Sequence, residues 1–145
     1  DNQIYRHQLI EDQDYGPGTA WLSDPVDFSQ ATSIAVDGTL WVSDGPSIRH
    51  FDRGTEVGFP QEIIDPPIQS VTDIWTDTDS TLLFILEALG DRMIVLDKET
   101  NALLGQYVDP ALRGARGISI DINDKTAYVV TQSELLIFPL TSVMR

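Results

Sequence analysis

The chain carries an internal repeat of about forty residues, and this repeat limits the folds that are open to it. Three segments each contain three short apolar runs that are separated by polar turns. Aligning Ile34, Ile74 and Ile118 superimposes these segments with spacings of 40 and 44 residues. The chain is therefore expected to stack three similar units side by side.

The apolar runs are predicted to be β-strands. They are rich in β-branched and aromatic residues, and Asp, Gly, Asn or Ser separates them. Asp37 and Gly38 indicate a tight hairpin, and no segment shows a sustained helical period. The predicted strands are residues 33–37, 39–44, 47–52 and 56–63 in the first repeat, 73–77, 81–88, 92–98 and 103–109 in the second, and 117–122, 126–131 and 134–140 in the third.

Two of these runs, residues 82–86 and 93–96, are apolar at every position, so their sheet must be covered on both faces. Sheets stacked face to face around an axis meet this demand. We therefore predict an all-β fold, a β-propeller with three four-stranded antiparallel blades per chain. The single half-propeller domain, residues 1–145, consists of an outer strand (1–10), a loop (11–30), blade one (31–63), blade two (71–109) and blade three (115–140), which lacks its outer strand.

The stretches "DGTLWVSDGPSIRHFD" and "LLFILEALGDRMIVLDKETNALLGQYV" resemble the NHL-type six-bladed β-propeller repeat. Asp44 and Glu87 occupy its acidic position, Arg49 and Arg92 its turn arginine, and Asp52 and Asp97 its closing aspartate. The third repeat departs from the pattern, because residues 131–133 (TQS) replace the acidic turn and no arginine follows. The resemblance implies a sensing or assembly domain of a larger bacterial protein, outside the cytoplasm.

Three blades cannot close a ring, because propellers contain roughly four to eight blades. Two broad apolar faces would remain in water. We expect two copies to pair as a homodimer into a six-bladed ring, with the lone strand 3–10 of each copy completing the last blade of the other. The alternative is that the chain, which opens on Asp1 and not on Met, is the second half of a six-bladed protein and pairs with a missing N-terminal half.

The formal charge of −14, from 9 basic and 23 acidic side chains, excludes two classes of partner. Such a surface repels phosphate backbones and anionic lipid, so neither nucleic acid nor a membrane surface is expected. No apolar run reaches the roughly 18 residues that a transmembrane segment needs. The absence of cysteine excludes disulfides, thiol nucleophiles and cysteine-ligated zinc.

Catalytic and metal-binding chemistry finds little support in the sequence. His7 and His50 are the only histidines, and we interpret both as surface or packing residues rather than ligands. The acidic stretches "DTDS" and "DIND" are interpreted as hairpin turns and not as calcium loops. No catalytic residue, metal site or cofactor is predicted.

The candidate binding residues lie in loops that share one face of a propeller, where turns between second and third strands meet the connections between blades. Trp21 is interpreted as a recognition anchor or as a cover between blades. Arg113 and Arg116 would receive an anion or a partner carboxylate, or bridge to Asp73 or Asp109. The full set is Trp21, Asp24, Asp44, Asp73, Glu87, Asp91, Arg113 and Arg116.

These residues predict a non-catalytic module that binds a protein, peptide or glycan. The same residues leave a different class open, a metal-dependent hydrolase or lactonase-like propeller enzyme with its site at the axis. In that class acidic side chains would supply the axial ligands. The repeated arginines, Arg49 and Arg92, are expected to pair with Asp44 or Glu87 and to tie the turn of each blade.

Overall fold

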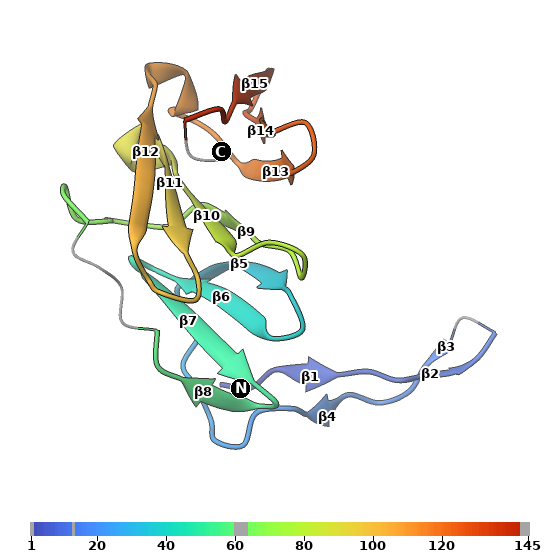
Figure 1. The fold of residues 1–145 in the computed structure, drawn as a ribbon. Coiled ribbons are helices and arrows are strands. Elements are labelled where there is room, and N and C mark those ends of the chain that lie inside the picture. Colours follow the sequence, from blue (N-terminus) through green and yellow to red (C-terminus); the bar gives the residue numbers. More distant parts are fainter. Residues whose placement is uncertain (1, 13, 60–63, 143–145) are drawn as a thin grey trace.

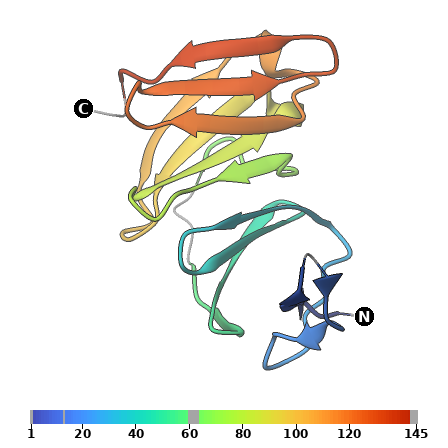
Figure 2. The ribbon, with the colours of Figure 1, turned by 90° about the vertical axis from the view of Figure 1, so that its right-hand side faces the viewer.

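The three repeats form three antiparallel β-sheets that lie face to face in chain order (Figures 1 and 2). The structure is a computed structural model and describes residues 2–12, 14–59 and 64–142. Two short 3₁₀ helices, η1 (Ala88–Gly90) and η2 (Pro110–Leu112), lie in the connections. Among the described residues, no helix has the length and apolar character needed to cross a membrane.

Blade one consists of β5 (Ala31–Val36), β6 (Leu40–Asp44), β7 (Ser47–Asp52) and β8 (Thr55–Val57), paired in that order. Blade two consists of β9 (Asp73–Trp75), β10 (Leu82–Glu87), β11 (Arg92–Asp97) and β12 (Leu103–Val108). Blade three consists of β13 (Gly117–Asp121), β14 (Thr126–Val130) and β15 (Leu135–Pro139). The ends of these strands differ from the predicted ends by at most two residues. The exception is the fourth strand of blade one, predicted over 56–63, of which residues 60–63 lie outside the described residues.

The first strands of the blades lie side by side on one side of the stack. β9 contacts both β5 and β13, so the three strands together form one edge of the stack, which we call the inner edge. Gly38, with φ of +97°, forms the turn between β5 and β6 at the position where the sequence predicted a hairpin. This alternation of strands places all turns of one kind at the same face of the molecule.

Two apolar clusters hold the blades together. Trp41 and Ile48 of blade one pack with the face of blade two that carries Ile74 and Ile85. The other face of blade two packs with blade three through a second cluster, which contains Phe84, Leu86, Met93, Val95, Leu112, Ala127 and Val129. The strands β10 and β11 are therefore buried on both faces, as the unbroken apolar runs predicted.

The N-terminal segment corrects the prediction of a lone strand over residues 3–10 and a loop over 11–30. β1 (Tyr5–Arg6) pairs with β4 (Thr19–Ala20), and β2 (Leu9–Glu11) pairs with β3 (Asp14–Tyr15), all within the same chain. The chain reverses at Asp12, which has a φ of 33°. We call these four strands, residues 5–20, the N-terminal ribbon, and Figure 1 shows it projecting away from the three blades.

Both ends of the stack expose apolar side chains. Blade three has only three strands in the described part of the chain, and Val130, Leu135 and Ile137 are exposed on its outer face. At the opposite end, Ile34 and Val36 are exposed on blade one. The stack therefore ends in a partly uncovered sheet on each side.

Candidate functional site

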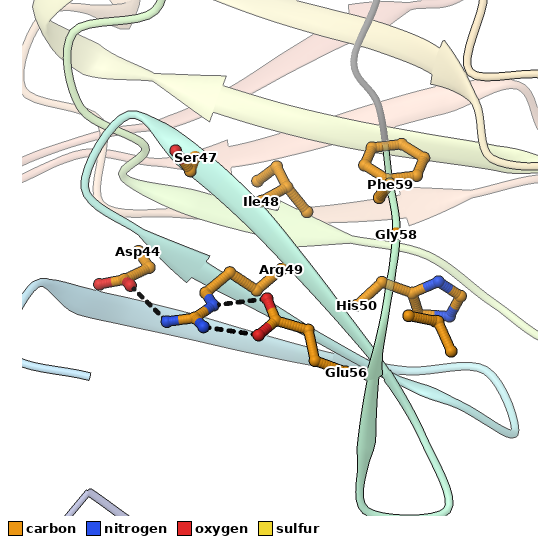
Figure 3. A pocket seen from close by; sticks show the side chains of 9 residues that line it. Asp44, Ser47, Ile48, Arg49, His50, Glu56, Gly58 and Phe59 are labelled. Atoms are coloured by element: carbon orange, nitrogen blue, oxygen red, sulfur yellow. Dashed lines mark hydrogen bonds and ion pairs between the residues drawn. The ribbon is translucent and has the colours of Figure 1, made fainter. Parts of the chain in front are cut away.

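Asp44, a candidate residue, lies in a charged cluster on blade one, next to a hollow of about 520 Å³ (Figure 3). Arg49 reaches Glu56 with two hydrogen bonds, of 2.8 and 2.6 Å, and Asp44 with a third of 3.3 Å. Its guanidinium also lies 5.8 Å from the ring centre of Phe28. The hydrogen bonds from Arg49 lower the pKa of Glu56 and raise the pKa of Arg49 itself. Arg49 thus holds the turn of blade one together, as its repeated position predicted.

Glu87, the equivalent acidic residue of blade two, is buried. Glu87 and Arg92 are 1% and 2% exposed, and Arg92 Nε donates to Glu87 Oε2 at 2.6 Å. Glu87 Oε1 accepts a hydrogen bond from the backbone of Gln69 at 2.6 Å, and Arg92 donates to Pro66 O at 2.7 Å. The pair therefore ties the connection between blades one and two to blade two. The structure does not place Glu87 on the loop surface.

Asp73 lies at the start of β9 and joins the inner strands of all three blades. Its carboxylate accepts hydrogen bonds from Ser33 Oγ, from its neighbour Ile74 N at 2.9 Å, and from Ile118 N at 2.8 Å. Ser33 belongs to β5 and Ile118 to β13. One carboxylate at the inner edge thus connects three sheets.

An ion pair on the loop face joins the exposed Arg113 to Asp91, whose side chain is only 17% exposed. Arg113 Nε and a terminal nitrogen donate to the two carboxylate oxygens of Asp91 at 2.9 and 2.5 Å. These hydrogen bonds lower the pKa of Asp91 and raise the pKa of Arg113. The predicted bridge from Arg113 to Asp73 or Asp109 is wrong, because its guanidinium pairs with Asp91. Asp109 instead caps η2 by accepting from Ala111 N.

Arg116 begins the entry into β13 and is exposed. Its backbone nitrogen donates to Val130 O at 2.8 Å, which fixes the chain at this point. Within residues 2–12, 14–59 and 64–142 its side chain forms no ion pair. Arg116 is therefore a cation on the loop face that is open to an anionic group.

Trp21 and Asp24 lie in the connection that enters blade one. Trp21 is half-buried and packs against the cluster that contains Leu40, Val42 and Phe51. This packing is on blade one, and Trp21 as a recognition anchor or as a cover between blades stays a prediction. Asp24 is exposed.

A cross-blade ion pair that the sequence did not predict lies on the opposite loop face. Lys98, after β11, donates to Asp37 Oδ2 at 2.7 Å and to Asp77 O at 2.8 Å. Asp37 belongs to the first turn of blade one, so the contact spans 61 residues of sequence. The "LDKET" turn contained the lysine, but no local pattern pointed to its partner.

The histidines have structural contacts, and the described residues contain no cluster suited to a metal ion. His50 stacks on Trp41 with ring centres 3.7 Å apart, and burial lowers its pKa. His7 Nδ1 lies 2.9 Å from Gly16 O. In the described part of the chain, no group of three or more His, Asp or Glu side chains is placed to hold a metal.

Comparison with known proteins identifies the fold but not the family. No family model matches the chain, and a search of curated proteins found no similar sequence. Solved structures do match. A structure of a nidogen/laminin complex is 20% identical, with a TM-score of 0.73 over 98% of this chain and 56% of that chain.

Two further structures match over 81% of this chain. Hydrazine synthase of Kuenenia stuttgartiensis is 18% identical, with a TM-score of 0.64 over 35% of its chain. The extracellular domain of a putative hybrid two-component system from B. thetaiotaomicron is 15% identical, with a TM-score of 0.55 over 18% of its chain. This chain thus spans about half or less of the chains that it resembles, and at these identities the likeness shows a β-propeller-like fold.

Proposed function

We propose that this chain is a non-catalytic binding module that recognises an anionic group of a protein partner on its loop face. Arg113 and Arg116 carry the proposal. Both are exposed on the connection between blades two and three, in a chain whose formal charge is −14. An exposed guanidinium attracts a carboxylate and can bind it with two hydrogen bonds, even on a protein that is acidic as a whole.

The two arginines would have different roles in binding. Arg113 is held by Asp91 through two hydrogen bonds, so its position is fixed before a ligand arrives. Arg116 has its backbone fixed by Val130 O and its charge exposed. A fixed backbone lowers the entropy cost of binding, so Arg116 is the residue expected to contact the ligand.

The similar structures are consistent with a binding role in a larger protein. One is a complex of nidogen with laminin, and another is the extracellular domain of a putative two-component system. We therefore propose a sensor or assembly domain of a larger bacterial protein, located outside the cytoplasm, with a protein as the favoured partner. Peptides and glycans that carry carboxylates belong to the same proposal as smaller ligands.

We also propose that the three blades are part of a six-bladed ring of the NHL type. The exposed apolar residues at both ends of the stack support this proposal, since stacked sheets are stable when covered. Either a second copy or the N-terminal half of a longer protein would complete the ring. Light scattering at micromolar concentration tests the second copy, because a monomeric mass would count directly against pairing.

Arrays of acidic and neutral peptides and of carboxylated and neutral glycans test the binding role. Arg116→Ala is expected to weaken binding to acidic probes by about tenfold, the value of one charge-assisted contact. Arg53→Ala is the matched control, since Arg53 is exposed in the turn between β7 and β8 on the opposite loop face. Equal losses in both variants, or no preference for acidic probes, would contradict the proposal.

A further inference from the structure

The N-terminal ribbon has the form of the outer hairpin of a blade. In blade one, Asp52 pairs with Thr55 across a two-residue turn that joins the third strand to the fourth. In the ribbon, Glu11 pairs with Asp14 across a turn of the same length. The first turn residue has a positive φ in both hairpins, with 48° at Arg53 and 33° at Asp12.

The sequence that follows the ribbon also matches the sequence that follows the other outer hairpins. An Asp-Pro pair follows each of the three hairpins, with its aspartate at Asp24, Asp65 or Asp109. Six residues before the aligned isoleucines, each connection then carries a large apolar residue that packs into the cluster in front of the next blade. These residues are Phe28, Ile68 and Leu112.

We propose that the ribbon is the outer hairpin of a fourth blade, and that a groove on blade one takes the two inner strands of that blade. The groove consists of two hollows of about 290 and 350 Å³ on either side of Ile4. Ile34 lines both hollows, with Val42 in one and Val36 in the other. This inference deepens the proposed half ring and depends on it.

Blade two shows what should fill the groove. Ile74 and Thr76 occupy the positions of Ile34 and Val36 in the next repeat. Ile74 is 4% exposed and Ile34 is 56% exposed, while Thr76 is 7% exposed and Val36 is 65% exposed. On the side of blade one, β9 contacts β5 and β6, the inner pair of that blade, and Ile74 shares a cluster with Trp41 of β6 and Ala35 of β5. The equivalent occupant at Ile34 is the inner strand pair of a preceding blade.

The number of strands argues against a second copy as this occupant. Blade three has three strands in the described part of the chain, and the ribbon contributes one hairpin whose two arms, β1–β2 and β3–β4, each count as one strand of a blade. Ile4 and Trp21, which flank the ribbon, already pack on the cluster around Phe51, where a third strand would lie. Two inner strands therefore complete a four-stranded blade with the ribbon, whereas β13, β14 and β15 of a second copy would make a blade of five.

The test uses the full chain, which contains no cysteine, so that one introduced thiol reports on one position. Ile34→Cys is compared with Ile74→Cys, its equivalent in the covered repeat, by the rate of reaction with N-ethylmaleimide. A second version of each chain carries an additional β5–β6 hairpin, the sequence of residues 31–44, joined ahead of Asp1 by a glycine–serine linker. A scrambled hairpin on the same linker is the control.

We expect the added hairpin to slow the reaction of Ile34→Cys by about tenfold, because the linker gives it a high effective concentration. The scrambled hairpin should leave the rate unchanged, and Ile74→Cys should react slowly in every version. Equal rates at Ile34→Cys with and without the true hairpin would overturn the proposal.

A second thiol distinguishes the competing occupant. If Ile34→Cys and Leu135→Cys both become protected as the concentration of the unextended chain rises, with a dimeric mass, the second copy fills the groove and the proposal is wrong. Binding of acidic probes through Arg116 is measured separately on the loop face. Failure of the groove proposal and failure of the binding proposal are therefore distinguishable.

Discussion

The ion pair between Asp37 and Lys98 is expected to stabilise the contact between blades one and two, and Lys98→Met tests this. Asp37 Oδ2 and Lys98 Nζ are 2.7 Å apart, and the side chains are only 6% and 12% exposed. Lys98 also donates to Thr76 Oγ1 at 3.2 Å. Such a shielded pair is screened by water and salt less than a surface pair, so its loss should be measurable.

The pKa of Asp37 gives the size of its contribution to the stability of the folded state. Partial burial alone would raise this pKa, but the hydrogen bonds from Lys98 and Thr39 outweigh burial and lower the pKa from 3.8 to about 2. Since a tenfold change in an acid constant corresponds to about 1.4 kcal/mol, ionised Asp37 stabilises the folded state by about 2 kcal/mol at neutral pH. The folded pKa lies below the unfolded pKa. The contribution is therefore complete well above pH 3.8 and is lost as the pH falls to about 2.

Urea unfolding followed by circular dichroism measures the effect. Lys98→Met keeps the aliphatic stem and leaves the Asp37 carboxylate without its cation, so we expect a loss of about 2 to 3 kcal/mol at neutral pH. The loss of unfolding free energy should be smaller near pH 3, because a protonated Asp37 no longer leaves an unpaired charge in a covered position. Lys125→Met, at the only other lysine, is the matched control on an exposed turn. Equal losses in the two variants, or a loss of Lys98→Met that does not change with pH, would refute the reasoning.

Four further substitutions separate buried from exposed roles. Arg92→Met should reduce the free energy of unfolding by about 3 to 5 kcal/mol, because the Glu87 carboxylate would stay buried without its cation; a urea titration showing less than about 1 kcal/mol would contradict this buried role. Asp73→Asn should cost about 1 to 2 kcal/mol and speed hydrogen exchange at the start of β13, since the amide keeps only one acceptor oxygen; unchanged exchange there would argue against the three-blade contact. Ile74→Ala should cost about 2 to 4 kcal/mol and Ile34→Ala less than about 1, and equal shifts in thermal unfolding would show that both positions are covered.

The strands of the three blades could be predicted because their signals are local. The apolar runs alternate with turns of Asp, Gly and Asn, and β10 and β11 are apolar at nearly every position because both of their faces are covered. The positions of the repeats followed from three isoleucines. Local chemistry was sufficient for these elements, because turn residues and strand composition act over a few positions.

The N-terminal ribbon was missed because its turn looks like a loop. The stretch "EDQDYGPGT" is acidic and rich in glycine and proline, which masked the pairing of Leu9 with Tyr15. An alignment of its Asp-Pro ending with Asp65 and Asp109 was the available signal. The burial of Glu87 was also missed, since the sequence shows a charged residue at a strand end and not the two groups that donate to it, Gln69 N and Arg92 Nε.

The charged residues of this chain divide according to whether they follow the repeat. Arg49 and Arg92 share one repeat position, and each is bonded to an acidic residue of its own blade. These two arginines are held by contacts within their own blades, so they are poor candidates for recognition.

Arg116 breaks the repeat. It occupies the position of Thr32 and Thr72, whose hydroxyls bond Val71 O at 2.9 Å and the backbone nitrogen of Ala88 at 3.0 Å. Where the first two blades place an internal hydrogen bond, the third blade places an exposed cation. Arg116 in place of threonine gives up this internal hydrogen bond, and it adds to the loop face a positive charge in a chain of net negative charge. Recognition is therefore expected where the repeat is broken, at the entry into blade three.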